Sequence, residues 1–384
     1  MIYFDNAATT YPKSESVYRA MDEANRQLAV NAGRGSYRVA RMAESMIDET
    51  RKRLLNLVHG NDDFHVVLTP SATIACNQII FGLEWSQGEN VYVSPYEHNA
   101  VMRTLEMVRE QYGVRIMELP LNLDRSVNIE KTKYLFSKDK PDKLFVTHVS
   151  NVTGYILPVK ELAVMAKNYG AVVVADGSQS LGLVNVDLRN TDIDFFVFAG
   201  HKTLYGPLGI GGFFMKCGSS LKPYIAGGTG TDSLNLHMPE GIPARYEPAS
   251  ANIVAIAGLC EALRNLEDEN TISDMLLQEQ KCNDLLTCGL EKIDGVKLYA
   301  APKGSGTGIC AFNIDGYKSS DVGMILDEDY DIAVRTGYHC APLIHKHLSN
   351  EAYLGVVRAS IGKFTTKEDI EKLLAAVEEI ALWQ

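Results

Sequence analysis

The chain of 384 residues is too long for one typical core of about 100–200 residues, so we expect two domains. Apolar residues make up 46% of it, which is ordinary for a globular protein and disfavours disorder. The net charge of −11 disfavours binding of nucleic acid or an anionic membrane through bulk charge. No apolar run approaches the ~18 residues needed to span a bilayer, and no secretory signal is visible. We therefore expect neither nucleic acid nor a membrane as a partner.

The seven cysteines indicate a reducing compartment. Their count is odd, their spacing is scattered and no CxxC pair occurs. We therefore expect free thiols, a cytoplasmic location, and mostly inert cysteines that pack in cores. They are residues 76, 217, 260, 282, 288, 310 and 340.

Helical and strand-like segments alternate through the first two thirds of the chain. The spacing of apolar residues predicts a helix over 38–59, and helical stretches follow at 98–111 and 158–169. Continuous apolar runs, typical of strands buried on both faces of a parallel sheet, occupy 65–69, 90–94, 143–150, 171–177 and 195–200. This pattern predicts an α/β fold with a mostly parallel sheet, whose ligand lies at the carboxyl ends of the strands.

The pattern changes near residue 250. Asn252 is predicted to cap a helix through about 267, and a second helix covers 273–292. Strand-like segments follow at 309–314 and 332–337, and the last helix is predicted to begin at a capping box over 365–368. We therefore predict a large α/β domain over 16–251 and a smaller α+β domain over 252–384.

Two charged residues follow neighbouring buried strands. Asp176 ends the run AVVVAD, and Lys202 lies in the glycine-rich segment FAGHKTLYGPLGIGG. The 26-residue step between them matches one crossover, so both would point into one crevice. Pyridoxal phosphate requires such a pair, a lysine that forms a Schiff base and a carboxylate that keeps the pyridine nitrogen protonated. Considered alone, Asp176 could instead be a strand-end cap, and Lys202 could be a surface lysine in a loop.

Three further features are compatible with such a site. His98 follows a strand and could stack on a flat ring, although a structural histidine is the plainer explanation. Thr73 opens a predicted helix whose N-terminus could hold phosphate, or it is a simple N-cap. The glycine-rich segment 227–232 resembles a phosphate cradle but lacks the lysine of a P-loop.

Cys340 lies in the polar segment RTGYHCAP, near Arg335 and His339. Positive charge beside a thiol favours the nucleophilic thiolate, so this cysteine is the candidate reagent. Arg358 ends an apolar run, and its planar fork suits a substrate carboxylate or a structural ion pair. A metal site is the competing interpretation, but the spacing matches no zinc pattern and we predict none. Its ligands would be His339, Cys340, His345 and His347.

In this order the motifs resemble the class V aminotransferase superfamily and, within it, the cysteine desulfurases. The resemblance runs nearly from end to end, and its cysteine loop is more similar to the Suf-type branch than to the Isc/Nif-type branch. The GGTGTDS segment also resembles a bacterial set described only as cysteine desulfurase-like. The motifs are YFDNAATT (3–10), NAGRGSY (31–37), EHNAV (97–101), SNVTG (150–154), VVADGSQS (173–180), FAGHKTLYGPLGIGG (198–212), RYEPASAN (245–252), RTGYHCAP (335–342) and VRASIGKFTT (357–366).

The resemblance implies a pyridoxal phosphate enzyme of fold type I, with a seven-stranded sheet and the N-terminal segment 1–15 packed on the small domain. It implies a homodimer that converts L-cysteine to L-alanine and passes sulfur, held on Cys340 as a persulfide, to an unidentified protein acceptor, as in iron–sulfur cluster assembly. By this pattern Lys202 carries the cofactor and moves the α-proton. The other implied contacts are Asp176 with the pyridine nitrogen, Gln179 with the phenolic oxygen, His98 with the ring, Ala72, Thr73 and His201 with the phosphate, Ser250 with the partner's phosphate, and Asn151, Arg335, His339 and Arg358 with substrate.

The chain departs from the family pattern around the phosphate. Ile74 and Ala75 replace a usual Glu-Ser pair, Ala199 replaces a usual serine, and EPASAN replaces E-x-G-T-P-N. Two alternatives therefore remain open. One is a selenocysteine lyase or another pyridoxal phosphate-dependent C–S lyase or aminotransferase. The other is a non-enzymatic sulfur-handling protein with a degenerate cofactor site.

Overall fold

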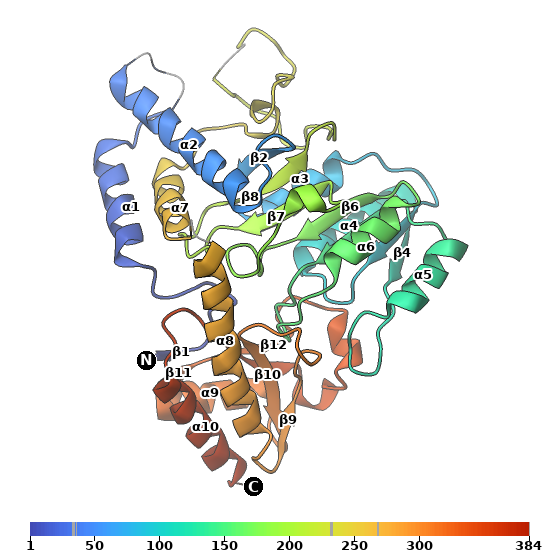
Figure 1. The fold of residues 1–384 in the computed structure, drawn as a ribbon, viewed down its shortest axis with the longest axis vertical. Coiled ribbons are helices and arrows are strands. Elements are labelled where there is room, and N and C mark those ends of the chain that lie inside the picture. Colours follow the sequence, from blue (N-terminus) through green and yellow to red (C-terminus); the bar gives the residue numbers. More distant parts are fainter. Residues whose placement is uncertain (33–34, 36, 231–232, 267–268, 384) are drawn as a thin grey trace.

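The computed structural model describes residues 1–32, 35, 37–230, 233–266 and 269–383 (Figure 1). Its helices are α1 Glu15–Gln27, α2 Arg38–Leu57, α3 Ala72–Gly82, α4 Asn99–Tyr112, α5 Ile129–Lys138, α6 Val159–Lys167, α7 Ile253–Arg264, α8 Glu269–Leu290, α9 Ser319–Tyr330 and α10 Lys367–Ala381. Its strands are β1 Ile2–Tyr3, β2 Phe64–Thr69, β3 Asn90–Val93, β4 Arg115–Glu118, β5 Lys143–Thr147, β6 Val172–Asp176, β7 Phe195–Ala199, β8 Gly211–Lys216, β9 Val296–Leu298, β10 Ile309–Ile314, β11 Ile332–Ala333, β12 Arg335–Gly337 and β13 Val356–Ser360.

Parts of two predicted motifs lie outside the described residues. They are Gly33, Arg34 and Ser36 of NAGRGSY and Thr231 and Asp232 of GGTGTDS. Within the part of the chain that is described, we find no helix both long and apolar enough to cross a bilayer.

The large domain is built on a seven-stranded sheet in the order β2-β8-β7-β6-β5-β3-β4. Strands β7, β6, β5, β3 and β4 run parallel, and β8 is antiparallel to both β2 and β7. The prediction of a mostly parallel, seven-stranded sheet is confirmed. The five apolar runs of the sequence correspond to β2, β3, β5, β6 and β7.

Strands β4 and β8 were not among the predicted elements. Residues of β4 are exposed or half-buried at the sheet edge, so they lack the continuous apolar signal. Strand β8 begins with two glycines, which indicate a loop when read alone. A Cβ on Gly212 would lie 2.2 Å from the Val67 carbonyl oxygen of the neighbouring strand, so this glycine reflects crowding inside the sheet.

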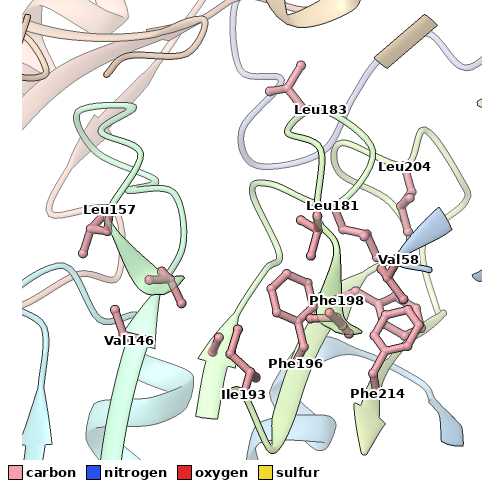
Figure 2. Close-up of a cluster of buried hydrophobic side chains, with 14 of the residues drawn as sticks. Val58, Val146, Leu157, Leu181, Leu183, Ile193, Phe196, Phe198, Leu204 and Phe214 are labelled. Carbon is pink, nitrogen blue, oxygen red and sulfur yellow. The ribbon is translucent and has the colours of Figure 1, made fainter. Parts of the chain in front are cut away.

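Helices cover both faces of the large sheet. One face packs against α2, α5, α6 and α7, and the other against α3 and α4. Alternate residues of one strand therefore enter different cores, as Phe196 and Val197 do. Figure 2 shows the first core, in which Phe196, Phe198 and Phe214 lie together. Burial on both faces explains why these strands read as continuous apolar runs.

The small domain has its own antiparallel sheet, in the order β12-β13-β10-β9, packed against α8, α9 and α10. Strand β1 pairs with β11, and Phe4 is buried in the core of this domain. The last helix does begin at a capping box, but the reciprocal pair is Thr366 and Asp369 rather than the predicted Thr365 and Glu368. The predicted α+β character of the C-terminal part is confirmed.

The contacts of α7 bear on the domain boundary. This helix begins where predicted, with Asn252 accepting a hydrogen bond from the Ala255 N–H. It packs against α1 and α2, and Ile256 and Leu259 join the core of the large domain. We therefore propose that the large domain extends to Leu266, beyond the boundary at 252 expected from the sequence, and that residues 1–15 belong with the small domain.

The N-terminal segment is predicted to stabilise the small domain through Phe4. The Phe4→Ala variant should lose about 3–5 kcal/mol of unfolding free energy, because a fully buried ring is removed from a packed core. Urea denaturation followed by circular dichroism measures the loss. Met324→Ala, on the exposed surface of α9, should change it by less than about 0.5 kcal/mol. Equal midpoints for Phe4→Ala and the wild type would contradict this placement of the segment.

Candidate active site

A cavity of about 210 Å³ lies at the carboxyl ends of the parallel strands. Strands β7, β6, β5 and β3 are neighbours in the sheet, so the segments that follow them meet at one edge. Eleven of the residues predicted from the sequence line this cavity: Ala72, Thr73, His98, Asn151, Asp176, Gln179, His201, Lys202, Arg335, His339 and Arg358. The structure thus brings together residues from both domains.

Asp176 and Lys202 face the same cavity, as their sequence spacing predicts. Asp176 is 8% exposed, and its Oδ1 accepts a hydrogen bond of 2.9 Å from the Ser178 N–H. Burial lowers the pKa of the Lys202 ammonium, and the nearby Asp176 carboxylate partly opposes this. A lysine held in this way is more readily a neutral amine, which is the form that acts as a nucleophile or base.

The N-terminus of α3 forms a second part of the cavity wall. Ser71, not Thr73, is the N-cap, and its hydroxyl accepts from the Ile74 N–H at 3.3 Å. Ala72 and Thr73 occupy the first turn, where backbone N–H groups and the helix dipole favour an anion. His201 lines the same cavity. Burial and the Lys202 charge lower its pKa to about 4, so the ring is neutral at pH 7.

His98 has a structural role and also lines the cavity. It is the N-cap of α4, and its Nδ1 accepts from the Ala100 N–H at 3.0 Å. Burial, together with the Lys202 charge, lowers the pKa of His98 to about 4. The ring is therefore neutral at pH 7, with its proton on Nε2, and it lines the cavity.

Gln179, Asn151 and Arg358 are held by partners in the protein. The Gln179 amide donates to the Ala7 carbonyl at 2.7 Å, and the Asn151 amide donates to the His339 carbonyl at 2.6 Å. Arg358 is 1% exposed, donates from Nη1 to the Asn151 carbonyl at 2.8 Å, and pairs through Nη2 with Asp5 at 2.6 Å. Arg358 thus forms the ion pair considered from the sequence and also faces the cavity.

Cys340 lies beside the cavity in a left-handed turn. The turn runs from Tyr338 to Ala341, whose N–H donates to the Tyr338 carbonyl at 3.0 Å. His339 and Cys340, its two central residues, have φ values of 46° and 56°, and each such non-glycine residue costs about 1–3 kcal/mol. A guanidinium nitrogen of Arg335 donates to the Cys340 sulfur at 3.8 Å. The turn therefore holds the thiol next to a cation.

The histidines near Cys340 have other partners. His339 bonds through Nε2 to the Val356 carbonyl, His345 bonds to the Tyr338 carbonyl and Asn350, and His347 lies 3.7 Å from Glu118. Among the residues that the structure describes, no three His, Cys, Asp or Glu side chains are grouped to hold a metal ion.

Ser250 is exposed and does not line the cavity of its own chain. Three residues in or beside the site were not singled out from the sequence. Asp5 and Glu97 lay inside quoted motifs, which were the available signal. Cys76, 2% exposed in the cavity wall, gave none, because an apolar helix with a cysteine indicates only packing.

The cavity wall carries polar atoms that lack partners. Ser178 Oγ, His201 Nδ1, His339 Nδ1 and Arg358 Nε are buried without a hydrogen-bond partner among the described residues, and all four side chains line the cavity. Unpaired buried polar groups are costly, so they indicate a polar ligand. A helix N-terminus for a phosphate, a carboxylate for a ring nitrogen and a buried lysine together fit pyridoxal phosphate.

Solved structures resemble this chain over nearly its whole length. The apo cysteine desulfurase of Thermococcus onnurineus NA1 has a TM-score of 0.89 and 28% identity, over 100% of this chain and 95% of that one. The Escherichia coli cysteine desulfurase CsdA, in an S-sulfonic acid form, has a TM-score of 0.85 and 27% identity, over 99% and 94%. The fold and the lysine–aspartate cavity thus define a pyridoxal phosphate enzyme of fold type I.

The sequence comparisons identify the family. Residues 2–373 match the model of the class-V aminotransferases, and the chain belongs to this family, whose members use pyridoxal phosphate. A probable cysteine desulfurase of Methanothermobacter thermautotrophicus is 33% identical, over 99% of this chain and 94% of the relative. A cysteine desulfurase of Pectobacterium atrosepticum is 32% identical, over 99% and 93%. The resemblance read from the motifs is confirmed.

Glu97 is predicted to make the protein less stable as the pH rises. It is fully buried and accepts from the Thr147 N–H at 2.6 Å, and burial raises its pKa to about 8. Between its ordinary pKa and 8, the native state keeps a proton that the unfolded chain has released. Stability should therefore fall with pH in this window by up to about 1.4 kcal/mol per unit.

The Glu97→Gln variant tests this, because an amide binds no proton. Its unfolding free energy, measured in urea from pH 5 to 8, should depend less on pH than that of the wild type. Glu130→Gln, on the exposed face of α5, should follow the wild type. A Glu97→Gln curve parallel to the wild type would show that the native carboxyl is already ionised.

Proposed function

We propose that this protein is a cysteine desulfurase, which converts L-cysteine to L-alanine and takes the sulfur onto Cys340. The observation that carries the proposal is the Cys340 thiol, which accepts a hydrogen bond from Arg335, and Arg335 lines the same cavity as Lys202 and Asp176. Full-length relatives above 30% identity that are named cysteine desulfurases support it.

The residues of the cavity would hold the cofactor as follows. Lys202 would attach it, Asp176 would face its ring nitrogen, His98 its ring and Gln179 its phenolic oxygen. The first turn of α3, with Ala72 and Thr73, and the neutral ring of His201 would bind the phosphate. When bound, pyridoxal phosphate withdraws electrons from the substrate α-carbon and labilises the α-hydrogen.

The protein then has to place the substrate and remove its α-proton. Arg358 offers its unpaired, buried Nε to the substrate carboxylate, with Asn151 and His339 beside it. Lys202, with its pKa lowered by burial, takes the proton from the α-carbon. Asp5 and the Asn151 carbonyl fix the Arg358 guanidinium, so the substrate enters a site that is already ordered.

Cys340 carries out the sulfur transfer. Its thiolate attacks the substrate sulfur, a sulfur–sulfur bond forms, and the substrate carbon–sulfur bond breaks. The released carbon takes up a proton to become the methyl group of alanine, and Lys202 returns a proton to the α-carbon. Arg335, whose guanidinium donates to the Cys340 sulfur, places a positive charge beside the attacking sulfur. The persulfide on Cys340 then passes its outer sulfur to an acceptor protein.

We also propose a homodimer in a reducing cytoplasm. Ser250 is exposed and does not line the cavity of its own chain, which supports a contact with the phosphate in the partner subunit. Leu234 and Leu236 are each 98% exposed in the segment before it, which supports a covered surface there. All seven cysteines are free.

Replacing Cys340 with serine should separate the two halves of the reaction. Alanine release from L-cysteine should fall by on the order of 10²-fold or more, because the sulfur nucleophile is lost. Exchange of the α-proton of L-alanine with D₂O, which needs Lys202 but no thiol, should continue. Alanine and sulfide assays measure the first rate, and proton NMR measures the second.

Cys288→Ser is the matched control, since this exposed cysteine lies on α8, away from the site. A wild type that releases no alanine from cysteine would refute the desulfurase proposal. Full activity in Cys340→Ser would instead favour a lyase that cleaves the carbon–sulfur or carbon–selenium bond without a persulfide.

A further inference from the structure

The turn that carries Cys340 needs support from its surroundings. Its two central residues, His339 and Cys340, have positive φ values, although neither is glycine or asparagine. Residues in such conformations persist only where neighbouring groups hold them. Neighbouring segments bind the backbone of this turn through hydrogen bonds.

Three successive backbone carbonyls of the turn accept hydrogen bonds from three other segments of the chain. The Cys340 carbonyl accepts from the Asn99 N–H at the start of α4, at 2.7 Å. The His339 carbonyl accepts from the Asn151 side chain at 2.6 Å. The Tyr338 carbonyl uses both lone pairs, for the Ala341 N–H and for Nε2 of His345 at 3.0 Å. The His345 contact comes from a side chain that does not line the cavity.

The His345 ring is held on both sides. Because Nε2 faces a carbonyl, it carries the proton, and Nδ1 accepts from the Asn350 amide at 2.7 Å. The Tyr338 ring packs edge-on against His345, with centroids 5.0 Å apart. His345 is 6% exposed and Asn350 is 1% exposed, so neither contact competes with bulk water.

The segment that carries His345 and Asn350 is packed against the protein and bonded to the chain that follows it. His345 lies in a short 3₁₀ turn, Ile344–His347, whose Ile344 is fully buried and is followed by Leu348, 2% exposed. The Asn350 carbonyl binds the N–H groups of Tyr353 and Gly355, just before β13. His345 and Asn350 therefore connect the Cys340 turn to β13, the strand that carries Arg358.

We propose that His345 and Asn350 are positioning residues for sulfur transfer: they clamp the Tyr338 carbonyl and hold Cys340 where its sulfur meets Arg335 and the substrate. The proposal rests on the proposed desulfurase function. Neither side chain lines the cavity, so both act through the turn and not on the substrate.

Hydrogen–deuterium exchange of the holoenzyme tests the clamp without reference to activity. In His345→Ala, the peptide that spans residues 338–343 should exchange about tenfold faster, because the Ala341 N–H loses its fixed acceptor. Asn350→Ala should act in the same direction from the other side of the ring. His345→Gln keeps an N–H donor and should restore much of the protection. Unchanged exchange in both alanine variants would overturn the proposal.

Kinetics distinguish positioning from general damage. In His345→Ala, kcat for alanine release should fall by about 10- to 100-fold, as expected when a reacting group is displaced by about 1 Å. The exchange of the L-alanine α-proton and the KM for L-cysteine should stay within about twofold, since Lys202 and Arg358 are untouched. His345→Gln should recover part of kcat.

His347→Gln is the matched control, because His347 lies in the same 3₁₀ turn as His345 but faces Glu118 at the surface. It should match the wild type in every measurement. Equal losses of alanine release and α-proton exchange in His345→Ala would mean that the whole site is disturbed, and would overturn the positioning role. If the wild type exchanges the α-proton but makes no alanine from cysteine, the desulfurase function fails, and the deuterium exchange still decides the clamp.

Discussion

The parallel alignment of neighbouring strands is the constraint on which the site depends. Strands β7 and β6 end side by side, so Lys202 and Asp176 meet although 26 positions separate them. Both sheet faces are covered by helices, so the strand ends are the place where charged groups can gather around a ligand. The lowered pKa of Lys202 follows from that enclosure.

The second requirement is that the small domain be fixed against this edge. Arg358 on β13 joins three parts of the molecule, because it bonds to the Asn151 carbonyl of the large domain and pairs with Asp5 of the N-terminal segment. A buried ion pair contributes little net stability, but it fixes geometry when its partners are well placed. The N-terminal segment therefore belongs to the site as much as to the fold.

Much of this was predictable, for physical reasons. Burial on both faces produces continuous apolar runs, so β5, β6 and β7 could be read from the sequence, as could Lys202 and Asp176 at the strand ends. Strand β8 could not, because crowding by Val67 selects glycine at 212, and glycine alone indicates a loop. The packing of α7 on α1 and the pairing of Arg358 with Asp5 depend on tertiary contacts between distant segments. Local patterns carry no record of such contacts.

The sulfur atoms of Cys76 and Cys340 both lie close to the cavity, but their environments differ. Burial, with Asp176 nearby, raises the pKa of Cys76 well above its ordinary value and keeps that sulfur a neutral thiol. Cys340 is partly exposed and touches a guanidinium. An electrophile that enters from solvent can therefore reach the partly exposed Cys340 sulfur, whereas the Cys76 sulfur is buried and protonated. Under the proposed function, the persulfide would therefore form on Cys340 and not on Cys76.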